Sequence, residues 1–114
     1  MEIKIIRDSI SRQEVRALAA AGFGDMVKVV VDIARGIMAV GGEMHADAES
    51  ILLQDGSRQD DLWGANIYPD LPPLTGIEYQ SLINIRPRCG NKTMEIKSEE
   101  IIKAVKSIIY TLVV

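Results

Sequence analysis

The chain has 114 residues, of which 47% are hydrophobic and 25% charged, a composition typical of one globular domain rather than of a disordered chain. Its net charge of −3 argues against a dedicated nucleic-acid-binding protein, and its single cysteine excludes an internal disulfide. No signal-like segment opens the chain, and no apolar run is long enough to span a bilayer. We therefore expect a single cytoplasmic domain, residues 1–114, without membrane contact.

A capping box marks the first predicted helix. Ser11 and Glu14 have the spacing at which each side chain reaches the backbone amide of the other. Gly22 is a natural end for this helix. Residues 3–6, before the helix, form either a short strand or a packed arm.

The next segment predicts a β-hairpin. Residues 26–33 alternate as a half-buried strand does, residues 34–36 supply a turn, and residues 37–44 return as the antiparallel partner. Gly41 and Gly42 weaken the second strand. They predict a bulge or a close approach of another backbone.

The middle of the chain predicts a short helix and two more strands. Residues 46–54 end at an Asp-Gly pair and favour a helix, although a strand is compatible with this length. Residues 61–68 alternate as a third strand, and three prolines make residues 69–76 a loop. Residues 77–86 predict a fourth strand, which ends at Pro87 because proline cannot donate to a ladder.

A last helix begins after Ser98, whose hydroxyl can cap it while Glu99 and Glu100 stand near its positive end. Its apolar face is wide for a chain of this size and comprises Ile101, Ile102, Val105, Ile108, Ile109 and Leu112. Burial against the sheet explains much of this face. We expect the surplus to form a homodimer interface, because large exposed apolar patches are uncommon on monomers.

Together these elements predict a two-layer α+β domain. A mainly antiparallel sheet of about four strands carries the N- and C-terminal helices on one face. We expect the other face to meet a second copy of the chain, or to hold a pocket that contains Glu43, His45, Asp47, Trp63 and Arg86.

The only histidine stands between two carboxylates. If its segment is extended, Glu43, His45 and Asp47 share one face. These three could hold a divalent metal ion, with Asp60 or Asp61 as a further ligand. They are also the candidate catalytic residues, with His45 as general acid or base and a carboxylate raising its pKa. The favoured alternative is structural: His45 caps the following helix or pairs with Asp47.

A second polar cluster stands at the end of the predicted fourth strand. Arg86 and Arg88 carry planar guanidinium groups that suit a carboxylate or phosphate. Asn84 shares a strand face with Arg86, and Asn91 lies in a turn that can offer backbone amides. These residues predict a site for a small anionic molecule.

Charge is distributed unevenly along the chain. Residues 41–80 hold eight carboxylates and one cation, whereas residues 81–114 hold six cations and three carboxylates. Mutual neutralisation explains this pattern without a ligand, because buried charges are usually paired. In this favoured interpretation Arg86 pairs with Glu43, Asp47 or the Asp60–Asp61 pair.

Trp63 and Asn66 lie on opposite faces of the predicted third strand. Trp63 is expected to be mainly a core residue, although it could also form the wall of a pocket. Asn66 could line that pocket or satisfy a turn. The methionines at positions 26, 38, 44 and 94 are expected to fill the core.

Several segments together resemble a known family. They are residues 23–28, 36–39, 41–47 (GGEMHAD), 55–57, 59, 61–69 (DLWGANIYP), 83–87 (INIRP) and 90–91. The set resembles a family of small prokaryotic proteins classed as a domain of unknown function. The resemblance implies that these segments occur together, and it implies no activity.

Three function classes therefore stay open. The first is a homo-oligomeric module that binds a small ligand or anion through the polar cluster around His45 and Arg86. The second is an enzyme that uses His45 as acid or base, with or without a divalent metal ion. The third is a scaffold that binds a partner through its C-terminal helix.

Overall fold

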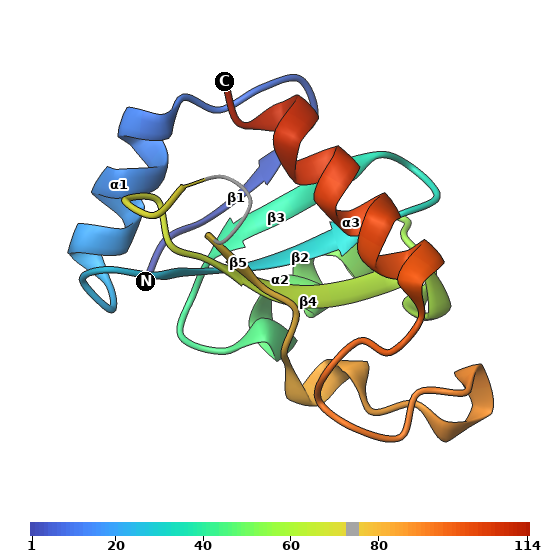
Figure 1. Ribbon diagram of the computed structural model, residues 1–114. Coiled ribbons are helices and arrows are strands. Elements are labelled where there is room, and N and C mark those ends of the chain that lie inside the picture. Colours follow the sequence, from blue (N-terminus) through green and yellow to red (C-terminus); the bar gives the residue numbers. More distant parts are fainter. Residues whose placement is uncertain (73–75) are drawn as a thin grey trace.

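The computed structural model describes residues 1–72 and 76–114 of the chain (Figure 1). One antiparallel sheet has the strand order β1-β3-β2-β4-β5. Its strands are β1 (Ile3–Ile6), β2 (Val27–Asp32), β3 (Ile37–Gly41), β4 (Leu62–Ile67) and β5 (Ile77–Glu78). The α-helices are α1 (Arg12–Ala21), α2 (His45–Gln54) and α3 (Glu99–Leu112), and short 3-10 helices are η1 (Gln59–Asp61), η2 (Leu82–Asn84) and η3 (Pro87–Cys89).

Helices cover both faces of the sheet. As predicted, α1 and α3 lie on one face, where Val15 and Val105 join the larger apolar core (Figure 1). On the opposite face α2 packs Ala48 and Leu52 against Val30 of β2. The α+β class and the placement of the terminal helices are confirmed, with five strands rather than about four. The face that was expected to meet a second copy or hold a pocket carries α2 instead.

The apolar residues of α3 are largely used inside the domain. The Ser98 hydroxyl accepts a hydrogen bond from the amide of Ile101, which confirms the predicted cap. Val105, Ile109 and Leu112 are buried, and partly buried residues pack against the same core, namely Ile101, Ile102 and Ile108. The homodimer prediction depended on a surplus of exposed apolar residues on this helix, and these residues largely pack inside the domain. Among the described residues no helix has the length and apolar character needed to cross a membrane.

β3 ends earlier than predicted. Gly41 and Gly42 have φ angles of 111° and 89°, which residues with a side chain rarely adopt. A Cβ atom at Gly41 would lie 2.1 Å from the carbonyl oxygen of Glu2. The close backbone approach is therefore confirmed, and the extension of the strand to residue 44 is wrong.

The predicted strand over residues 77–86 is also wrong. β5 comprises only Ile77–Glu78, and η2 and η3 follow it. The Ser81 hydroxyl accepts from the amide of Ile83 at 3.2 Å, and Pro87 occupies the first position of η3. Both devices favour a helical turn over a strand. The predicted loop over residues 69–76 includes residues 73–75, which lie outside the described residues.

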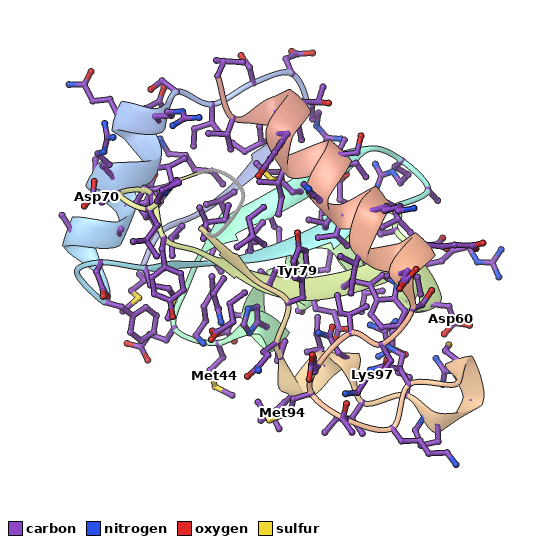
Figure 2. The ribbon with its side chains drawn as sticks, in the orientation of Figure 1. Met44, Asp60, Asp70, Tyr79, Met94 and Lys97 are labelled. Carbon is purple, nitrogen blue, oxygen red and sulfur yellow. The ribbon has the colours of Figure 1, made fainter. Side chains whose placement is uncertain are left out.

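The methionines do not all fill the core. Met38 is fully buried, as expected. Met44 and Met94 are 56% and 42% exposed and lie on the same side of the molecule, beside the start of α2 (Figure 2). For these two residues the core prediction is wrong.

Candidate functional site

The helix α2 disrupts the predicted group of Glu43, His45 and Asp47. The helix begins at His45, so residues two apart no longer share a face. His45 is buried, whereas Glu43 and Asp47 are exposed. Within residues 1–72 and 76–114 no three His, Cys, Asp or Glu side chains are grouped closely enough to hold a metal ion. The extended arrangement behind the metal and catalytic hypotheses is therefore wrong.

His45 bonds to the backbone of the sheet rather than to a carboxylate. Its Nε2 atom lies 2.7 Å from the carbonyl oxygen of Ala65. Because a carbonyl only accepts, Nε2 carries the proton and Nδ1 is the basic atom of the neutral ring. Burial lowers the pKa of His45; the bond to Ala65 opposes this shift, and the charge of Lys28 adds to it. The expected rise in pKa from a neighbouring carboxylate is wrong.

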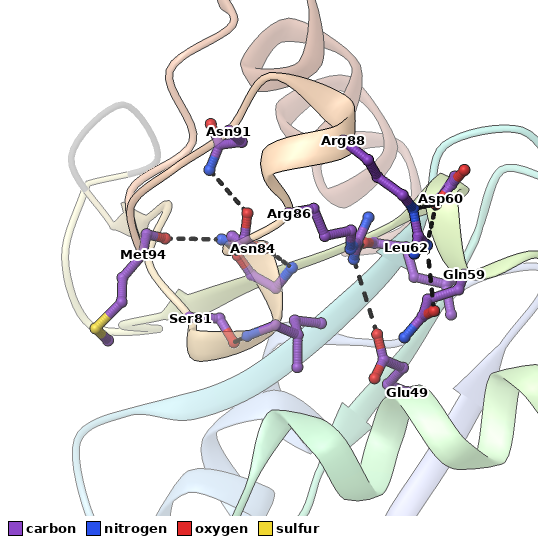
Figure 3. A network of polar contacts seen from close by, with 12 residues as sticks. Glu49, Gln59, Asp60, Leu62, Ser81, Asn84, Arg86, Arg88, Asn91 and Met94 are labelled. Atoms are coloured by element: carbon purple, nitrogen blue, oxygen red, sulfur yellow. Dashed lines mark hydrogen bonds and ion pairs between the residues drawn. The ribbon is translucent and has the colours of Figure 1, made fainter.

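Side chains of the segment after β5 occupy the edge of β4 that β5 leaves unpaired. The Asn84 amide accepts from the Gly64 N–H at 2.8 Å and donates to the Gly64 carbonyl at 3.0 Å (Figure 3). The Arg86 guanidinium donates to the carbonyl of Leu62, two residues earlier in β4. Asn84 and Arg86, two residues apart, thus bond to Gly64 and Leu62, which are also two residues apart. A paired strand would show the same alternation. Asn84 and Arg86 form these bonds through their side chains, which protects the edge.

Gly64 is enclosed between two side chains. A Cβ atom at this position would lie 2.5 Å from the Cβ of Ser81 and 3.1 Å from the Cδ2 of His45. Close approach therefore requires glycine here. The segments around His45, Gly64 and Asn84, which carry the family resemblance, meet at this edge of the sheet.

Two more predicted ligand residues have structural partners. The two N–H groups of the Asn91 amide are shared among three backbone carbonyls between residues 84 and 95, and its oxygen accepts from the amide of Lys97. It therefore holds the loop that follows η3. Asn66 donates to the carboxylate of Glu78 at 2.8 Å, which links β4 to β5.

Arg86 is the centre of a buried cluster with Glu49 and Trp63. Its Cζ atom lies 4.8 Å from the centroid of the Trp63 ring. Its Nη2 atom lies 3.8 Å from Oε2 of Glu49, as Figure 3 shows. The second distance gives an ion pair but is too long for a hydrogen bond. Arg86 therefore pairs with Glu49 and not with the predicted carboxylates, which were Glu43, Asp47, Asp60 and Asp61.

Three buried atoms of this cluster have no hydrogen-bond partner in the part of the chain that the structure describes. They are Arg86 Nη1, Trp63 Nε1 and Glu49 Oε2. A further such atom, Asn66 Oδ1, lies beside His45. Leaving a buried polar atom unpaired costs about 1–3 kcal/mol. All three atoms belong to Arg86 or to the two side chains that it contacts.

Glu49 was not singled out from the sequence. Burial raises its pKa, while the charge of Arg86 and a hydrogen bond from Gln59 oppose that shift. The signal was present in the spacing: in a helix that begins at His45, Glu49 stands one turn later on the same face. Residues 46–54 were predicted as a helix, but His45 was placed in an extended segment before it, so the two residues were not connected.

Arg88 lies outside the cluster. It is exposed and donates to Asp60 at 2.6 and 3.1 Å and to Gln59 at 3.3 Å (Figure 3). This contact lowers the pKa of Asp60. Arg86 and Arg88 therefore do not form the expected two-arginine site.

A cavity of about 260 Å³ lies between α1, α3 and β5. Its walls are mainly apolar and include Val15, Ile67, Ile77 and Ile109. It is slightly smaller than the roughly 300 Å³ at which typical ligand pockets begin. No residue that lines this cavity carries one of the unpaired buried polar atoms found among the described residues. The cavity therefore offers a ligand fewer specific polar contacts than the Arg86 cluster does.

The comparisons with known proteins bear on the family alone. A family model described as "Protein of unknown function (DUF5674)" matches residues 4–112. No curated protein and no solved structure matches the chain. The expected kinship with an uncharacterised family is confirmed, and the description of that family assigns no activity.

Proposed function

We propose that this chain, which belongs to the DUF5674 family, is a small-molecule-binding protein whose binding centre is the cluster of Glu49, Trp63 and Arg86. One observation carries the proposal: the Arg86 guanidinium and the two side chains that it contacts each keep one buried polar atom without a hydrogen-bond partner among the described residues. Native proteins pair nearly all buried polar groups, and the exceptions call for an explanation. A bound polar molecule supplies one.

The burial of the three side chains indicates the direction of entry. The side chain of Glu49 is 13% exposed, whereas Arg86 is 6% and Trp63 is 1% exposed. A guest therefore approaches along the Glu49 side, from α2, and places its polar end against Arg86.

His45 supports binding less well than Arg86 does. Its Nε2 atom is engaged by Ala65, and burial favours its neutral form. Acid–base catalysis by His45 would need a partner that sets its pKa near neutrality. The exposed positions of Glu43 and Asp47 do not favour that role, so we place binding before catalysis.

The indole N–H of Trp63 provides the test, because the chain has one tryptophan and hence one indole signal. Titration with formate and with formamide, followed by proton–nitrogen correlation NMR, should shift this signal saturably with at least one probe. Arg16→Lys alters an exposed guanidinium that pairs with Asp70, and this control should bind as the wild type does. If neither probe gives a saturable shift, the proposal fails.

A further inference from the structure

We infer that the group held between Glu49 and Arg86 is a neutral carboxamide, or a group with the same pattern of one acceptor and one N–H donor, rather than an anion. This inference rests on the proposed function and specifies its ligand class. It reverses the expectation that arginine content alone suggests.

Charge balance is the first reason. The ionised carboxylate of Glu49 offsets the guanidinium of Arg86 across 3.8 Å. Asp60 and Arg88 form their own ion pair and leave this balance unchanged. A bound anion would add an uncompensated charge beside Arg86 and Trp63, which are both more than nine-tenths buried, and burial of an unpaired charge is strongly unfavourable. A neutral guest adds none.

Hydrogen-bond matching is the second reason. The unpaired atoms comprise two donors, Arg86 Nη1 and Trp63 Nε1, and one acceptor, Glu49 Oε2. A carboxamide oxygen has two lone pairs for the donors, and its N–H group can donate to the carboxylate. A carboxylate guest would satisfy the donors but would face Glu49 with like charge and no donor. A site that accepts a hydrogen bond from an N–H group of its ligand rejects analogues that lack this group.

Formamide and formate isolate this difference, because one carries an NH₂ group where the other carries a charged oxygen. Both are titrated at about pH 8, where carboxylates are ionised, with the Trp63 indole signal as readout. The wild type should bind formamide about tenfold more tightly than formate, or better. Glu49→Gln removes the negative charge and introduces an amide donor. The preference of this variant should therefore move about tenfold or more toward formate.

The outcomes separate the two proposals. Equal affinities, or tighter formate binding by the wild type, would overturn the ligand class and leave the proposed function standing. An unchanged preference in Glu49→Gln would also overturn the ligand class. No saturable shift with either probe would overturn both proposals and leave the cluster to bound solvent. If Glu49→Gln fails to fold, which the same spectra reveal, the wild-type comparison still decides.

Discussion

Asn84 forms with Gly64 the pair of hydrogen bonds that a neighbouring strand would form. Its side-chain oxygen accepts from the Gly64 amide at 2.8 Å, and its nitrogen donates to the Gly64 carbonyl at 3.0 Å. The same nitrogen donates to the carbonyl of Met94 at 3.0 Å. One amide therefore replaces a strand at the edge of β4 and fastens the following loop to it.

Asn84→Asp removes the donor while keeping the shape of the side chain. The carbonyls of Gly64 and Met94 lose their partner, and a carboxylate is introduced at a fully buried position. We expect the free energy of unfolding, measured by urea denaturation, to fall by about 2–4 kcal/mol. Gln13→Glu, an amide-to-acid change at an exposed position of α1, should stay within about 0.5 kcal/mol. Equal losses in the two variants would show that the edge does not depend on this amide.

Gly64→Ala tests the close contact with Ser81. The new Cβ atom would lie 2.5 Å from Ser81 Cβ and 2.7 Å from Ser81 Oγ, so the backbone must shift. We expect a loss of about 2–3 kcal/mol in unfolding free energy. Ser81→Gly removes both atoms, and the double variant should recover about 1 kcal/mol relative to the sum of the single changes. Strictly additive effects would place the cause outside this contact.

Arg86→Lys and Arg88→Lys form a matched pair, because only Arg86 is buried. A lysine ammonium cannot both lie flat over Trp63 and bond the Leu62 carbonyl as the planar guanidinium does. We expect Arg86→Lys to lower the unfolding free energy by about 2–3 kcal/mol and to change Trp63 fluorescence. Arg88→Lys keeps an exposed ion pair with Asp60 and should cost less than about 1 kcal/mol. Similar losses of unfolding free energy in both variants would show that the buried Arg86 contributes no more to stability than the exposed Arg88.

Local signals in the sequence predicted much of the fold. The Ser11 hydroxyl accepts from the Glu14 amide at 3.0 Å, as the capping box requires. The alternation over residues 26–33 gave β2 and its antiparallel neighbours, because one side of that strand meets α1 and α3 and the other meets α2. Such patterns depend on neighbours along the chain, and they can be recognised without knowing the tertiary structure.

The candidate site was harder to predict because its contacts join distant segments. Residues 77–86 were predicted as a strand, yet a serine cap and a proline favour helical turns there. The partner of Arg86 could not be selected by charge alone, since several carboxylates were available. Glu49 is the partner because α2 begins at His45 and carries Glu49 one turn later on the same face.

The buried histidine makes stability depend on pH in a defined direction. Burial lowers the pKa of His45, so the unfolded chain binds the proton more tightly than the folded protein does. Stability should be complete above the unfolded pKa of about 6.5 and should fall as the pH drops below it. His45→Gln retains a donor for the Ala65 carbonyl but does not titrate. Between about pH 7.5 and pH 5.5 its unfolding free energy should therefore fall less than that of the wild type.

Urea denaturation at several pH values measures this difference directly. The sign is informative, because a histidine paired with a carboxylate would have a raised pKa. Such a protein would gain stability, relative to His45→Gln, as the pH falls through that value. A gain of this kind would restore the interpretation in which Glu43 or Asp47 partners His45.

Ile109 distinguishes a core role for α3 from an interface role. Its side chain is 3% exposed and packs in the core that α1 and α3 share with the sheet. Ile109→Ala should therefore lower the unfolding free energy by about 2–4 kcal/mol and leave the size of the folded particle, measured by light scattering, unchanged. Lys103→Ala, at an exposed position of the same helix, should cost less than about 0.5 kcal/mol. If Ile109→Ala instead halved the particle mass without loss of stability, this face of α3 would hold two copies together rather than close the core of one.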